Sequence, residues 1–437
     1  MGSATHGNVL SLVRDADTGR RLGKYEVLCR LSEGGMATLF LAMAKGAAGF
    51  RKLVVLKRVL PEMASEPDSV DRFLDEARVM AGFSHPHIAQ VFDLDQEGAD
   101  FFLAMEFVTG ASLLELVNAC LDEHDVLPLG FALAVARDVA LALHYAHTYV
   151  DPTGRPRRII HRDVAPKNVM VTYEGVTKLL DFGVAKAEGS DITRSGMVIG
   201  TPGYMAPEQS VGKTLDGRTD IFALGVTLFE AMTGQRLYGR ATPDAEMRAP
   251  FEGPPPRPSQ LNKRIPLRLD ALVLKALSKA KEDRYATALE FAKAIETVSG
   301  ELIWPFDKRA ELVQRLFKGR REQSRRLLQA VEDGQDATVL NFPAISTPAK
   351  PDVTEDFVPQ FDDPAISATP TRPGRGQQQQ ATAGEPTSTP GRSGWRWLWW
   401  ALVPATVIGA VVALAKLLPA QQSARAVRVE GSADAGD

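Results

Sequence analysis

The chain has 437 residues, of which 44% are hydrophobic and 24% are charged, and its formal net charge is −3. This composition is ordinary for a globular protein and argues against nucleic-acid binding, which normally requires a strongly basic domain. The two cysteines, Cys29 and Cys120, lie far apart in apolar segments. They exclude a disulfide framework of several bridges and fit a reducing cytosol.

Within the first 300 residues, the spacing of apolar residues changes once, from strand-like to helical. Residues 1–24 form a leader without the basic and apolar regions of a signal peptide. From 25 to about 105, short and partly alternating apolar runs such as "TLFLAMA" predict strands, interrupted by one helical stretch, "DSVDRFLDEARVMAGF". From about 109 to 300 the apolar spacing is mostly helical. We therefore expect an α+β fold with a small β-rich lobe followed by a larger α-helical lobe.

The segment that follows combines basic charge with amphipathic spacing. Residues 301–345 predict one or two helices, with a basic face over 308–328. That face has two interpretations: it docks on an acidic partner or a lipid surface, or it is solvated while the helix packs on the larger lobe. Residues 346–394 are rich in Pro, Thr and Gln and predict a disordered linker.

The last part of the chain predicts a membrane anchor. Within residues 395–418, the 18 residues from Leu398 to Ala415 carry no charge, and tryptophans gather at the start of the segment. This pattern is typical of one transmembrane helix with an interfacial aromatic belt, and a buried core helix is the alternative. Residues 419–437 would form a short tail beyond the membrane. Arginines on both sides leave the orientation open.

Several motifs in the two lobes suggest phosphoryl transfer. A glycine turn at Gly34 and Gly35 lies between two strands, where backbone amides can approach phosphates. Lys57 ends the strand motif "VVLK", and Glu76 lies on the next helix, where it can hold the lysine by an ion pair. In "HRDVAPKN", Asp163 can accept a proton from a substrate hydroxyl.

Two residues supply oxygen ligands for a hard cation. Asn168 closes "HRDVAPKN", and Asp181 begins "DFG" after a short strand. "GTPGYMAPEQ" and "TDIFALGVTLFEAMTG" follow. This ordered set resembles the eukaryotic-type (Hanks-type) protein kinase family in its bacterial, membrane-anchored Ser/Thr form, over roughly residues 25–300.

The resemblance implies a bilobal kinase fold, the use of ATP with Mg²⁺ (Mn²⁺ as an alternative), and protein substrates. Lys57 would pair with the phosphates and with Glu76, and Asp163 would be the catalytic base. Asn168 and Asp181 would hold the metal. The implied nucleotide pocket consists of Leu31, Gly34, Gly35, Leu39, Val55, Lys57, Glu106, Val108 and Met170, with Met105 as gatekeeper and the backbones of Glu106 and Val108 binding adenine.

The chain departs from the family pattern at several positions. Ser32 and Ala37 replace two glycines of the usual turn. Ser/Thr members usually carry a lysine two residues after the catalytic aspartate, where this chain has Ala165. We expect Lys167 to take over its work on the γ-phosphate, with a solvated surface lysine as the alternative. Thr201 resembles the threonine that shapes the acceptor site in Ser/Thr kinases.

The resemblance also implies structural and regulatory residues. Glu208 would pair with Arg284, and Asp220 would brace the catalytic loop. Thr193 and Ser195 are the expected autophosphorylation sites. We expect a kinase domain in the bacterial cytoplasm, anchored once in the inner membrane, with the tail outside and a homodimer as one route for signals. A membrane-anchored pseudokinase that binds nucleotide or partners without catalysis is the alternative function.

Overall fold

The computed structural model describes residues 17–33, 37–59, 74, 77–98, 100–182 and 200–333. All of them belong to one compact unit. Most of the expected leader, the linker at 346–394 and the expected membrane span at 395–418 lie outside the described residues. Most of the two lobes and of the basic extension lies within the described residues.

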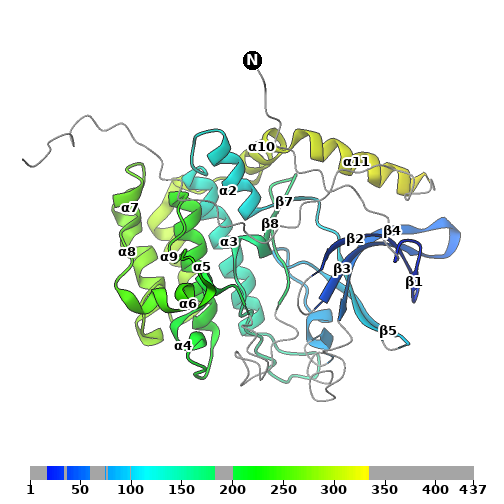
Figure 1. Ribbon diagram of the computed structural model, residues 1–437, viewed down its shortest axis with the longest axis horizontal. Helices are drawn as coiled ribbons and strands as arrows, with labels where there is room; N and C mark the ends of the chain where they lie inside the picture. Colours follow the sequence, from blue (N-terminus) through cyan, green and yellow to red (C-terminus); the bar gives the residue numbers. More distant parts are fainter. Residues whose placement is uncertain are drawn as a thin grey trace, which may run out of the picture. The chain divides into compact units, whose positions relative to one another are not determined.

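The small lobe is built on one antiparallel sheet, in agreement with the predicted strands (Figure 1). Its strand order is β1-β2-β3-β4-β6-β5. The strands are β1 (Arg21–Leu22), β2 (Tyr25–Glu33), β3 (Ala37–Lys45), β4 (Arg51–Val59), β5 (Val91–Glu97) and β6 (Asp100–Glu106).

Both faces of this sheet are covered by apolar side chains. Successive residues of a strand point to opposite faces, and β3 shows the consequence. Phe40 and Ala42 pack into one buried cluster, whereas Leu41 and Met43 pack into another. By the same alternation, the second face also carries Leu39 on β3 and its partner Lys57 on β4.

The large lobe is helical, as predicted (Figure 1). Its helices up to residue 299 are α2 (Leu113–Asp122), α3 (Leu129–His147), α4 (Pro207–Ser210), α5 (Gly217–Thr233), α6 (Pro243–Glu252), α7 (Pro258–Leu261), α8 (Arg268–Ala276) and α9 (Ala288–Ser299). Among the described residues, α3 alone is long and apolar enough to cross a membrane, yet 72% of its apolar stretch is buried inside the protein. Its apolar residues lie on several sides because it is a core helix of the lobe, with 13 of its 19 residues buried.

A small three-stranded sheet of the large lobe positions the polar motifs. It consists of β7 (Gly110–Ser112), β8 (Val169–Thr172) and β9 (Thr177–Leu179), in that order. The motif "HRDVAPKN" runs directly into β8, and Asp181 follows β9 by two residues. The antiparallel pairing of Val169 with Leu179 therefore brings the two motifs together.

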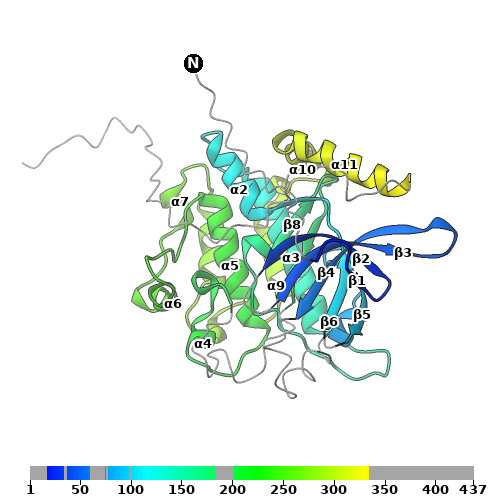
Figure 2. The ribbon, with the colours of Figure 1, turned by 45° about the vertical axis from the view of Figure 1, so that its right-hand side comes forward.

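The basic extension is helical, as expected, and it contributes to the core. Its two helices are α10 (Phe306–Leu316) and α11 (Lys318–Glu332). Arg309 on α10 is fully buried, and its Nη1 lies 2.7 Å from Oδ2 of the buried Asp138 on α3. A buried charge needs such a partner, because the cost of leaving it unpaired is several kcal/mol. The expected packing on the large lobe thus holds for α10, but Arg309 of the basic face is buried and not solvated. Helix α11 continues to the small lobe (Figure 2).

Candidate active site

An ion pair joins the two lobes at the centre of the site. Lys57 lies in the middle of β4, between Leu39 on β3 and Leu103 on β6. Its Nζ lies 2.8 Å from Oδ1 of Asp181. Burial would raise the pKa of the Asp181 carboxyl, but the ammonium of Lys57 holds this pKa below its ordinary value. The Asp181 carboxyl is therefore ionised near neutral pH.

An apolar pocket lies behind this ion pair. Its lining includes Met105, the expected gatekeeper, together with Lys57 and Asp181. Phe182 also lines the pocket, and its ring packs edge-on against Phe83 with centroids 5.5 Å apart. Phe182 is buried, so its packing fixes the backbone that presents Asp181 to Lys57. Glu76, the side chain expected to pair with Lys57, lies outside the described residues, and the ion pair with Asp181 was not anticipated.

Three of the expected residues gather around the carboxylate of Asp163 in the catalytic-loop motif. Oδ1 of Asp163 accepts a hydrogen bond from Thr201 Oγ1 at 2.8 Å. Its Oδ2 accepts one from Asn168 Nδ2 at 3.1 Å, and Lys167 Nζ lies 3.8 Å from the same oxygen. Ala165, by contrast, is buried. The contact anticipated between Thr201 and Asp163 is thus present, while the chemical roles of Thr201 and Lys167 stay predictions.

The backbone of the loop is held by Asp220 on α5, as expected. Its Oδ2 accepts from the amide of His161 and its Oδ1 from the amide of Arg162, both at 2.8 Å. Arg162 has a φ of 64°, a left-handed conformation that is costly for a residue with a side chain. These hydrogen bonds therefore stabilise an otherwise unfavourable turn.

Two residues that the sequence analysis missed complete this support. His147 on α3 places Nε2 2.7 Å from Oδ2 of Asp220. Burial would raise the pKa of Asp220, but His147 and the loop amide hold that pKa below its ordinary value. Gln209 donates from Nε2 to the carbonyl of Arg162 at 3.1 Å. Gln209 closes the motif "GTPGYMAPEQ", but the local sequence does not indicate the partner of either residue, because both partners are distant along the chain.

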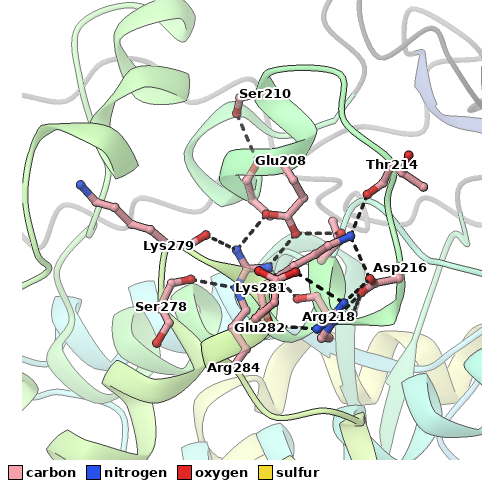
Figure 3. A network of polar contacts seen from close by, with 12 residues as sticks. Glu208, Ser210, Thr214, Asp216, Arg218, Ser278, Lys279, Lys281, Glu282 and Arg284 are labelled. Atoms are coloured by element: carbon pink, nitrogen blue, oxygen red, sulfur yellow. Dashed lines mark hydrogen bonds and ion pairs between the residues drawn. The ribbon is translucent and has the colours of Figure 1, made fainter.

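A second buried ion pair fixes the segment after Thr201, as expected from the motifs (Figure 3). Arg284 donates from Nη1 and Nη2 to the two carboxylate oxygens of Glu208, at 2.6 and 2.8 Å. Thr219 donates to the same carboxylate at 3.0 Å. Such two-pronged pairing fixes orientation as well as distance. The helix α4 is thereby tied to the base of the lobe.

The expected nucleotide-binding residues lie on several elements around the ion pair. Leu31, Leu39 and Val55 are partly exposed on β2, β3 and β4. Met170 is partly exposed on β8, and Val108 follows β6. Gly34 and Gly35 lie outside the described residues, as do Thr193 and Ser195.

The hinge requires one refinement of the expected adenine contacts. The amide of Glu106 already donates to the carbonyl of Gln90 at 2.8 Å. The carbonyl of Glu106 is therefore the backbone group that can accept from adenine. The Glu106 side chain is also engaged, since Lys178 Nζ lies 3.0 Å from its Oε2.

The donor set fits a magnesium nucleotide. Asn168 donates its amide nitrogen to Asp163, so the amide oxygen is the atom that can ligate a cation. Mg²⁺ is usually held by one or two protein oxygens and otherwise by phosphates and water. Asn168 and Asp181 supply such oxygens. Within the described part of the chain, no group of three or more His, Cys, Asp or Glu residues forms an independent metal site.

Comparisons with known proteins agree with this geometry. Residues 25–295 match the protein kinase domain family. The chain is 42% identical over 280 residues to the tyrosine-protein kinase MasK of Myxococcus xanthus, covering 64% of this chain and 43% of that protein. It is 33% identical over 308 residues to the serine/threonine-protein kinase Pkn1 of Myxococcus xanthus, covering 69% of this chain and 42% of Pkn1.

A solved structure shows the same fold. The kinase domain of Mycobacterium tuberculosis PknI is 31% identical, with a TM-score of 0.51, covering 65% of this chain and 98% of that one. The chain spans about two-fifths of the length of the curated relatives MasK and Pkn1. Since the family match covers more than half of its residues, the chain belongs to the protein kinase family, with bacterial Hanks-type kinases as relatives.

Proposed function

We propose that this chain is a protein kinase that transfers the γ-phosphoryl group of ATP to serine or threonine hydroxyls of proteins, itself included, in bacterial signal transduction. One observation carries the proposal. The carboxylate of Asp163 is oriented by Thr201 and Asn168, with a lysine ammonium beside it. This arrangement suits the acceptance of a proton from a hydroxyl and the stabilisation of negative charge next to it.

Each residue of the site has a defined task in this proposal. Bound ATP with Mg²⁺ supplies the transferable phosphoryl group and neutralises part of its charge. Lys57 binds phosphate oxygens, and Asn168 and Asp181 hold the metal. Asp163 accepts the hydroxyl proton, and Thr201 keeps its carboxylate turned toward the acceptor.

The acceptor amino acid is the part of the proposal that most needs a test. The contact from Thr201 to Asp163 supports a Ser/Thr acceptor. Pkn1 and the PknB of Mycobacterium leprae are named serine/threonine kinases, but MasK is named a tyrosine kinase. Similarity alone therefore does not decide between the two acceptors.

Phosphoamino-acid analysis of the full chain after incubation with labelled ATP and Mg²⁺ identifies the acceptor amino acid. We expect label on serine and threonine in the wild type. Asp163→Asn, which keeps the size and loses the base, should lower the rate by about 100-fold or more. Label confined to tyrosine would contradict the acceptor assignment. Equal rates in wild type and variant would contradict the role of Asp163.

The same labelled wild type tests an expected regulatory step. We propose that phosphate on Thr193 or Ser195 activates the enzyme by pairing with cationic groups near the loop. Phosphopeptide mapping of active enzyme should find at least one of the two sites occupied. Fully active enzyme without phosphate at either site would refute this step.

One observation favours the pseudokinase alternative. Ala165 is 1% exposed and stands where Ser/Thr members usually have the lysine that steadies the γ-phosphate. We propose that Lys167 replaces that lysine, because its Nζ lies 3.8 Å from Asp163 Oδ2 and its side chain is 38% exposed. An ammonium in that place can reach both the carboxylate and a phosphate beside it.

Lys167→Ala should lower kcat by about 100-fold, because it removes one cation that acts in the transition state. Lys167→Arg should keep a substantial part of the rate. Lys263→Ala, at an exposed position of the large lobe, is the matched control and should be neutral. Steady-state kinetics with ATP make the comparison. Wild-type kcat in Lys167→Ala would show that Lys167 is an ordinary surface lysine.

We also propose that residues 395–418 anchor the kinase in the bacterial inner membrane, with the catalytic domain in the cytoplasm, where ATP is. The uncharged run of 18 residues from Leu398 to Ala415 supports this. The full chain should remain in the membrane fraction after an alkaline wash, and deletion of 395–437 should release it. Full-length protein in the soluble fraction would overturn the anchor.

A further inference from the structure

One face of the small-lobe sheet continues beyond the expected nucleotide pocket. On β3 and β4, alternation places Leu39, Val55 and Lys57 on the same face. Leu41 and Leu53 continue this face along the two strands. The register agrees, since Leu41 pairs with Val55.

The extension helix α11 covers this continuation. Leu327 and Val331, each 3% exposed, form a buried cluster with residues of β2, β3 and β4. These partners are Leu28, Cys29, Leu41, Met43 and Leu53. They lie on the side of the sheet that faces the nucleotide, so α11 and the nucleotide would share one surface.

The cluster reaches the rim of the expected nucleotide pocket at two points. Leu31 and Phe107 are partly buried and pack against it. Leu31 is the expected pocket residue at the end of β2. Phe107 lies in the hinge between Glu106 and Val108, the two residues expected to bind adenine. The cluster that α11 completes therefore extends to both the roof and the hinge of the expected pocket.

The other end of α11 is attached to the large lobe. Arg320 places Nη1 2.6 Å from Oε1 of Glu115 on α2. Before it, Gln314 on α10 donates to the carbonyl of Tyr173 at 2.7 Å. Arg309 adds its buried pair with Asp138. Figures 1 and 2 show α10 and α11 running from the helices of the large lobe toward β2 and β4.

Besides the hinge, the two lobes are connected by the ion pair of Lys57 with Asp181 and by α11. Closure of lobes around a ligand needs hinge segments that change conformation. A helix of 15 residues spans about 22 Å and bends little, so it transmits the position of one lobe to the other. The sheet face formed by β2, β3 and β4 is thereby linked to the large lobe through α11.

We propose that Leu327 and Val331 are positioning residues for nucleotide binding, through which α11 holds Leu31 and Phe107 in the geometry that accepts adenine. The inference rests on the proposed function and adds to it a part of the chain outside the family match, which ends at residue 295. A pocket shaped in advance binds its ligand more tightly, since less ordering is required on binding.

The test uses the full chain and measures the Kd of a fluorescent ATP analogue with Mg²⁺, which requires no phosphoryl transfer. Leu327→Ala combined with Val331→Ala should raise Kd by about 10-fold, with kcat at saturating ATP changed less than about 2-fold. The matched control is Leu328→Ala on the same helix, whose side chain is 39% exposed. The Kd of this control should match that of the wild type. Leu327→Met, which keeps an apolar side chain of similar size, should bind the nucleotide almost as tightly as the wild type.

A second variant covers the case in which the double substitution unfolds the small lobe. Arg320→Gln cuts the attachment to Glu115 and leaves the apolar cluster intact, and the exposed Arg321→Gln is its control. Arg320→Gln should also weaken nucleotide binding, with a Tm near that of its control.

Three results would overturn the inference. One is an unchanged Kd in the double variant and in Arg320→Gln, even with a lowered Tm, because α11 would then be only a structural cover. The second is an equal loss in Leu328→Ala. The third is a wild type that binds no nucleotide, and this result would overturn both the proposed function and this inference. Nucleotide binding without phosphoryl transfer would overturn the proposed function alone.

Discussion

The site depends on the buried carboxylate of Asp220. It accepts the amides of His161 and Arg162 at 2.8 Å each, and His147 binds it from α3. Without these bonds the left-handed φ of 64° at Arg162 would cost about 1–3 kcal/mol without compensation. The turn delivers the next residue, Asp163, to Thr201. A core helix, α5, thereby sets the direction of the catalytic carboxylate.

The remaining parts of the site follow from this fixed loop. The motif continues into β8, and the pairing of β8 with β9 brings Asp181 alongside. Asp181 then meets Lys57 of the small lobe at 2.8 Å, so the interlobe ion pair is positioned from the large-lobe side. The helix α11 adds a second connection, from Arg320 on the large-lobe side to Leu327 and Val331 on the small lobe.

Motifs in the sequence predicted several of the contacts, because each motif contains residue types suited to one chemical task. Thr201 contacts Asp163 as expected. The pairing of Glu208 with Arg284 was also anticipated from the motifs. In each case the motif specifies a residue type and its position in the order of motifs along the chain. Once the fold is known, that information is enough to predict which side chains are in contact.

Other contributions could not be read from the sequence. His147 lies three residues from His144 on α3, and spacing alone does not reveal its partner on α5. The apolar spacing of Leu327 and Val331 predicts a buried side of a helix, but it does not say which lobe buries it. The basic extension was therefore open to two interpretations, neither of which included the small lobe. Such contacts are tertiary: His147 and Asp220 are 73 positions apart, and the partners of Leu327 and Val331 lie at the opposite end of the described chain.

The most direct test of this account is the kinetics of Asp220→Asn, which keeps the shape of the side chain and replaces one acceptor oxygen by a donor. One loop amide then loses its acceptor, and Asp163 should move. We expect kcat to fall by about 10- to 100-fold while the Kd for nucleotide stays near wild type. Asp216→Asn, at the exposed N-cap of the same helix, is the control. Unchanged kcat in Asp220→Asn would contradict the claim that this carboxylate sets the catalytic loop.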